Sequence, residues 1–319
     1  MSDLDALLAG IVADPHDQLR WLIVADWLDD HEQCDRAELL RLHRELIRTC
    51  CEPDQHPERA AWQARIVELI DQGVKPVVPQ HTLMLPGGVP LVGNFIPPGS
   101  FLMGSNDGEV NERPVHQVTL TKGFFLGIYP VTQAQWQAVM RIDSSYFKGD
   151  QLPSEMVSWD DTRAFCTQLT KEPELIVRLP TEAEWEYACR AGTTTHFHFG
   201  DVPTVQRMNY SGKGKWNGSK SAKAPEQPSA VGTFAANPWG LFDCHGNVGE
   251  WCSDLYAEGY YAHSPAIDPE SIVSGQLFRV SRGGSWCRYP ERCRSSRRSW
   301  NDSDIHFSHY GFRVVFTLS

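Results

Sequence analysis

The chain of 319 residues changes character near residue 75, and this change constrains the fold more than any other feature. Before it, leucine, isoleucine and tryptophan recur at spacings of three and four residues, which is typical of amphipathic helices. From residue 91 onward, short β-rich runs alternate with glycine, asparagine, proline and aspartate. Prolines and glycines between the two parts indicate a linker. We therefore predict an α+β protein with an all-α module at 1–75, a linker at 76–90 and a loop-rich domain at 91–319.

Helix-capping residues support this division. Ser2 precedes the first leucine run and can cap its helix. Beyond the linker, Thr132 and Ser158 precede two further helical runs, and Thr181 stands in capping-box spacing with Glu184 before a third. The second part should therefore combine short strands with a few well-capped helices.

The segment LRWLIVADWLDDH, residues 19–31, loosely resembles the small repeat-companion module found at the front of some bacterial proteins. Nothing catalytic follows from that resemblance. We expect residues 1–75 to serve as a docking or oligomerisation unit with a protein partner of its own.

Charge and composition exclude several classes of function. A formal net charge of −11 argues against a nucleic-acid-binding surface, because phosphate contacts need clustered lysine and arginine. The chain has no apolar run of the roughly 18 residues that a membrane-spanning helix requires. Its start has no basic segment followed by a long apolar one, so no signal peptide is predicted. Nine irregularly spaced cysteines then favour reduced thiols and a soluble, cytoplasmic protein.

Several motifs beyond the linker follow one another in a fixed order. They are FLMGSNDGEVNERPVHQVTL, FFLGIYPVTQAQW, RLPTEAEWEYACRAG, GLFDCHGNVGEW, and RGGSWCRYPERCRSSRR followed by GFRVVF. Together they resemble the formylglycine-generating enzyme family, also called the sulfatase-modifying-factor family, over roughly residues 91 to 319. The resemblance implies an elaborated C-type lectin fold.

The resemblance also implies structural calcium. Family members bind it at the GNVGEW position, which carries over to Asn247, the carbonyl of Val248, and Glu250. Oxygen donors of this kind suit calcium. A second family site lies near MNYSG and would involve Asn209 and Tyr210, with its other ligands in the stretch that follows. The alternative for GNVGEW is a tight turn held by asparagine and glutamate hydrogen bonds.

Enzymes of this family oxidise a substrate cysteine with copper held by two cysteines shortly after their GGSY motif. The candidates here are Cys287 and Cys293. Five residues separate them, whereas four separate the family's catalytic pair. Aligning Arg294 and Arg298 with the family's arginines places Cys293 beyond the second catalytic position. That leaves Cys287 alone, which is a poor site for Cu(I). A copper-dependent formylglycine-generating oxidase remains the alternative function.

The segment IHFSHY, residues 305–310, has neither helix nor strand periodicity. In a C-type lectin fold the stretch between the two final strands lines an exposed binding face. A branch of the family consists of the variable proteins of diversity-generating retroelements. In these proteins the adenines of a template are randomised, and the mutated codons fall between RGGSW and GFR. An AAC codon can there become Cys, Arg, Tyr, Ile, His, Phe or Ser. Residues 287–289 and 305–310 all belong to that set, and they cluster at both ends of one loop region.

These observations predict a non-catalytic protein that displays a variable lectin-type surface to a protein or other macromolecular ligand. An ordinary lectin-like domain is a further alternative. Tyr289, Phe307 and Tyr310 should be exposed if aromatic side chains anchor the ligand. The predicted surface comprises Trp286, Cys287, Arg288, Tyr289, Trp300, Asn301, Ile305, His306, Phe307, Ser308, His309 and Tyr310.

Overall fold

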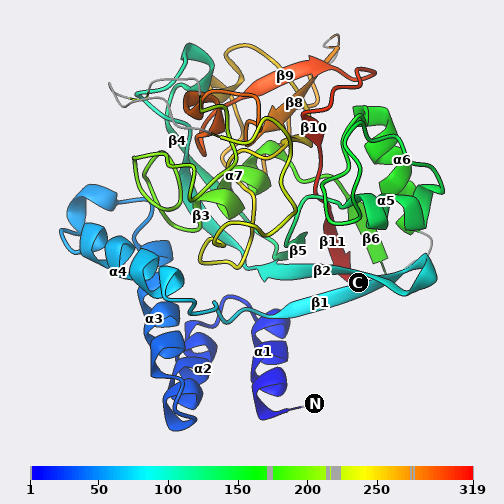
Figure 1. The fold of residues 1–319 in the computed structure, drawn as a ribbon. Helices are drawn as coiled ribbons and strands as arrows, with labels where there is room; N and C mark the ends of the chain where they lie inside the picture. Colours follow the sequence, from blue (N-terminus) through cyan, green and yellow to red (C-terminus); the bar gives the residue numbers. More distant parts are fainter. Residues whose placement is uncertain are drawn as a thin grey trace.

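The computed structural model describes residues 2–170, 175–212, 216, 224–273, 275 and 277–318. The first part of the chain is helical, as predicted, and it lies against one end of a larger domain of sheets, loops and helices (Figure 1). Ser2 caps the first helix by accepting a hydrogen bond from the Asp5 amide over 3.2 Å. The helices of this module are α1 (Asp3–Ala13), α2 (Gln18–Asp30), α3 (Cys34–Arg48) and α4 (Arg59–Asp71).

The predicted linker at 76–90 is wrong, because most of it belongs to a β-hairpin. Strand β1 (Gln80–Leu85) pairs antiparallel with β2 (Val89–Ile96) along its whole length. The proline and glycines that suggested a linker form the turn between them, Pro86–Gly88. Gly87 and Gly88 have φ values of 79° and 77°, a left-handed conformation that glycine adopts without steric cost.

Eleven strands in the described residues form three sheets. A five-stranded sheet has the order β1-β2-β5-β11-β6, so the last strand of the chain lies between two earlier ones and closes the domain. The four-stranded sheet β10-β7-β8-β9 lies at the end remote from the helical module (Figure 1). The remaining strands are β3 (Gly99–Met103), β4 (His116–Leu120), β5 (Phe124–Gly127), β6 (Leu175–Arg178), β7 (Gly249–Leu255), β8 (Phe278–Arg282), β9 (Ser299–Asp302), β10 (Tyr310–Gly311) and β11 (Val315–Leu318).

Three helices within this domain begin at the predicted capping residues. They are α5 (Gln133–Met140), α6 (Trp159–Leu169) and α7 (Glu182–Arg190), each preceded by a threonine or serine in a capping box. All nine residues of α7 are buried, so this helix forms the centre of the domain. No helix among the described residues is long and apolar enough to cross a membrane.

The helical module packs directly onto the second domain. The ring of His43 packs against that of Trp239 with centroids 4.2 Å apart, and the ring of Trp21 lies 6.3 Å from it. Arg59 of α4 donates to the carbonyl of Gly192, just beyond α7, over 2.6 Å. Burial lowers the pKa of His43 to about 3, so this imidazole is neutral within a largely apolar contact. The two parts therefore share one hydrophobic core.

Candidate functional site: a two-loop face and its cavity

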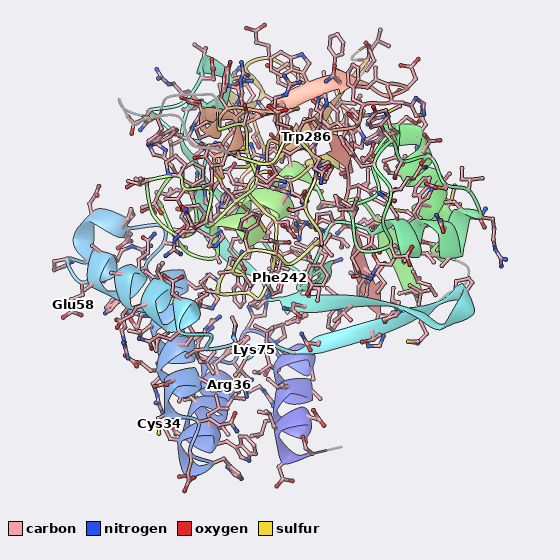
Figure 2. The ribbon with its side chains drawn as sticks, viewed as in Figure 1. Cys34, Arg36, Glu58, Lys75, Phe242 and Trp286 are labelled. Atoms are coloured by element: carbon pink, nitrogen blue, oxygen red, sulfur yellow. The ribbon has the colours of Figure 1, made fainter. Side chains whose placement is uncertain are left out.

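Two loops that are distant in sequence meet beside the four-stranded sheet. The indole Nε1 of Trp286 donates to the carbonyl of Ser308 over 3.1 Å. The guanidinium of Arg288 donates to Nε2 of His309, also over 3.1 Å. Figure 2 shows Trp286 on the opposite side of the domain from Cys34 and Arg36 of the helical module. Segments 286–289 and 305–309 thus form one surface, which we call the two-loop face.

The exposure of the predicted binding residues differs along this face. Tyr289 is 55% exposed, Phe307 44% and Trp300 38%. Arg288 and His306 are also exposed, whereas Trp286, Cys287, Asn301, Ile305, Ser308 and His309 are partly buried.

The prediction that Tyr310 is exposed is wrong, since only 5% of it is accessible. Tyr310 begins β10, which pairs with β7, and its ring stacks on Trp251 with centroids 4.9 Å apart. Its hydroxyl accepts a hydrogen bond from Nδ2 of Asn301 over 2.9 Å. Tyr310 therefore supports the face from below.

Two of the exposed aromatic side chains, Trp300 and Phe307, are held in place by neighbouring rings. Trp300 stacks on Tyr256 with centroids 4.0 Å apart, and Phe307 stacks on His309 at 5.2 Å. His306 bonds the carboxylate of Asp161 over 2.8 Å. Rings fixed in this way lose little conformational entropy when a ligand covers them.

Buried ion pairs fix the segment between the two loops. Arg298 contacts both carboxylate oxygens of Glu182 at 2.7 and 2.8 Å. Arg294 does the same with Glu112 at 2.8 and 2.7 Å. All four side chains are nearly inaccessible, and a buried charge is tolerated when it is paired and hydrogen-bonded. The basic run RCRSSRR is therefore largely an internal framework of the domain.

A cavity of about 220 Å³ opens between the two loops and the edge of the sheet. Some predicted residues line it, including Arg288, Trp300 and His309. Sequence reasoning missed Arg282, Ser281, Arg292 and Arg297 as lining residues. The available signal was the basic run at 292–298, whose placement depends on tertiary structure.

Residues 92–318 match the family described as the sulfatase-modifying factor enzyme 1-like domain. The chain belongs to this family. It is 34% identical to the formylglycine-generating enzyme of Mus musculus over 208 residues, covering 63% of this chain and 53% of that one. It spans only 37% and 41% of the first two curated relatives that it matches.

Two solved structures resemble the chain over most of their length. Treponema denticola variable protein 1 superposes with a TM-score of 0.65 and 26% identity, covering 74% of this chain and 98% of that one. PvdO from Pseudomonas aeruginosa gives a TM-score of 0.63 at 26% identity, covering 72% and 95%. The predicted C-type lectin-like α+β fold is thereby confirmed.

Membership in this family raises the question of copper. Cys293 is fully buried with Phe197, Met208 and Tyr210, and burial raises the pKa of its thiol to about 12. Its sulfur lies 3.7 Å from the carbonyl of Tyr289. A copper ligand that faces a substrate must be accessible to it, and Cys293 is fully buried, so Cys293 does not fit that role. The partly buried Cys287 then has no cysteine partner suited to that role.

The GNVGEW position does not fit calcium either. Both carboxylate oxygens of Glu250 accept from Arg313, at 2.6 and 2.7 Å, and one also accepts from Trp185 at 2.7 Å. The side-chain amide of Asn247 bonds the backbone N–H and C=O of Ser229. The side-chain oxygens expected to bind calcium already serve as acceptors within the fold. The carbonyl of Val248 alone would be a poor site.

The second calcium position differs. Oδ1 of Asn209 is buried and has no hydrogen-bond partner among the described residues, so it could serve as a ligand. Tyr210 is buried in the aromatic cluster around Cys293. The other ligands were expected after Gly212, where 213–215 and 217–223 lie outside the described residues. Within the described part of the chain, no three His, Cys, Asp or Glu side chains are grouped to hold a metal.

Proposed function

We propose that this protein binds a protein or other macromolecular ligand through the two-loop face, as a variable protein of the retroelement type. The observation that carries the proposal is the meeting of segments 286–289 and 305–309 on one surface that exposes the rings of Tyr289 and Phe307, the latter stacked on His309. A rigid support of buried ion pairs lies beneath it. The similarity to Treponema denticola variable protein 1 supports the same function.

A library of this chain tests the proposal without a known ligand. Positions 287–289 and 305–309 would be randomised and displayed, and binders would be selected against one purified globular protein. We expect selected variants to bind at micromolar affinity or better and to melt close to the parent chain. A matched library at the partly buried or exposed positions of α6 should yield no binders. General unfolding of the loop variants would contradict the proposal.

An oxidase function remains the second candidate, because the matched relatives include formylglycine-generating enzymes. That function needs Cu(I) at Cys287 and Cys293, and the buried thiol of Cys293 speaks against it. Stoichiometric Cu(I) binding that is lost in Cys293→Ala would favour the oxidase over display.

The helical module supports a separate docking role. Leu19, Leu22 and Ile23 of α2 are 65%, 47% and 51% exposed, and their spacing places them on one side of the helix. An exposed apolar group of this kind is typical of a protein contact. We propose calcium binding only at the position of Asn209. A cytoplasmic location stays a prediction.

A further inference from the structure

The cavity in the two-loop face has an unusual charge. The chain carries a net charge of −11, yet four arginines and no acidic residue line this cavity within the described part of the chain. The arginines are Arg282, Arg288, Arg292 and Arg297. Such a concentration of one sign of charge favours a ligand group of the opposite sign.

Two of these arginines form ion pairs with glutamates. Arg282 pairs with Glu186, and Arg297 bonds Glu109 over 2.9 Å. Arg288 and Arg292 have no ion pair with an acidic residue among the described residues. Both residues are exposed and line the cavity, so the positive charge beside it is not compensated by an ion pair.

Three buried side chains in the walls of the cavity also keep unpaired polar atoms. Arg282 and Arg297 are 1% and 4% exposed, and the Nε of each is buried without a hydrogen-bond partner in the described structure. The hydroxyl of Ser281, also 1% exposed, is equally unpaired. Buried donors are nearly always satisfied, and an unpaired one costs about 1–3 kcal/mol. These unpaired atoms lie in the walls behind the cavity surface, so the case for a ligand rests on the charge that the arginines place there.

The position of Arg288 suits such a ligand. Its guanidinium donates to Nε2 of His309 over 3.1 Å, which holds it at the cavity mouth. Burial and the neighbouring Arg288 lower the pKa of His309 to about 4, so the imidazole stays a neutral acceptor near neutral pH. His309 therefore orients the arginine without neutralising its charge.

We propose that the cavity is the anchoring pocket for an acidic side chain, aspartate or glutamate, of a protein ligand held on the two-loop face. The proposal rests on the proposed display function. A guanidinium fork matches a carboxylate in shape and charge. The volume of about 220 Å³ is several times the roughly 30 Å³ of one water, so the cavity admits a side chain. Exposed Tyr289 and Phe307 would then contact the apolar surroundings of that side chain.

The test follows the arginine Nε–H signals of ¹⁵N-arginine-labelled full-length protein by NMR. Ac-Asp-Glu-NH2 is the probe, Ac-Asn-Gln-NH2 its uncharged match, and inorganic phosphate a third titrant. We expect saturable shifts with the acidic dipeptide and none with the amide. The double variant Arg288→Ser, Arg292→Ser should weaken binding at least tenfold, and it should fold because both residues are exposed.

A matched variant, Lys122→Ser with Arg163→Ser, removes two exposed positive charges elsewhere. Equal weakening in both double variants would reduce the effect to overall charge and overturn the pocket. Saturation with phosphate alone would replace the carboxylate by a phosphate group. Absence of any saturable shift would also overturn the pocket. A protein that the parent chain binds through Tyr289 and Phe307, and that binds the Arg288→Ser, Arg292→Ser variant equally well, would remove the pocket while leaving display intact.

Discussion

Arg313 holds the carboxylate of Glu250 through two hydrogen bonds of 2.6 and 2.7 Å, and neither side chain is accessible to solvent. Arg313 also donates to the carbonyls of Gly127 and Phe242, at 3.0 and 2.9 Å. One guanidinium thus ties the segment before β11 to β5, to β7 and to the loop around Phe242. This pair belongs to the framework below the two-loop face.

Replacing Glu250 by glutamine should therefore destabilise the fold strongly. The variant leaves Arg313 buried without its counter-charge, and loss of one partner of a buried pair costs about 3–5 kcal/mol. Chemical denaturation measures the loss. Glu45→Gln is the control, because its ion pair with Arg48 is exposed and should contribute less than about 1 kcal/mol. A calcium-dependent rise in Tm that disappears in Glu250→Gln would contradict this assignment.

Aromatic side chains of the face should separate into two classes. Tyr289→Ala and Phe307→Ala remove exposed rings, and such changes usually alter stability by about 0.5 kcal/mol or less. Tyr310→Ala removes a buried ring stacked on Trp251 and should cost about 3–5 kcal/mol. Thermal and urea unfolding of the three variants provides the comparison. Equal losses for all three would show that the exposed rings are structural.

Glu155 should make stability depend on pH. It is buried, its Oε1 accepts from the Phe147 amide over 2.8 Å, and its Oε2 has no partner among the described residues. Burial raises the pKa of this carboxyl from 4.5 to about 7. Between these values the folded chain binds more protons than the unfolded one, so the free energy of unfolding falls as pH rises.

Glu155→Gln removes this titration and keeps the Oε1 acceptor. The stability of the parent relative to the variant should decrease between about pH 5 and pH 8. Denaturation curves at several pH values give this difference directly. A parent that gains stability relative to the variant over the same interval would contradict the raised pKa.

The two loop cysteines should differ in reactivity. A thiol-specific reagent should modify the partly buried Cys287 in the folded protein and leave Cys293 intact, because burial raises the pKa of the Cys293 thiol to about 12. Mass spectrometry of Cys287→Ala and Cys293→Ala variants separates the two sites. Rapid modification of Cys293 at neutral pH would reopen its role as a copper ligand.

Local hydrogen bonding explains what the sequence predicted well. Ser2, Thr132, Ser158 and Thr181 cap helices through contacts three residues away, and such contacts depend on few other parts of the chain. The fold of the second domain was predicted from the resemblance of its motifs to a known family.

Tertiary contacts explain why three predictions from the sequence were wrong. The turn at Pro86–Gly88 has the composition of a linker, and only the pairing of β1 with β2 distinguishes the two. Glu250 has the chemistry of a calcium ligand until Arg313 is placed beside it. Tyr310 follows five residues that reach the surface at least in part, and only the pairing of β10 with β7 buries it.

Sequencing the genomic DNA around the codons for 286–313, with several kilobases on either side, would show whether the two-loop face is diversified. We expect a nearby near-copy of this region that differs only where it carries adenines, beside a reverse-transcriptase reading frame. We also expect related isolates to differ at 287–289 and 305–309 while RGGSW and GFRVVF stay fixed. No such copy, with identical loop codons in every isolate, would contradict a diversified binding face.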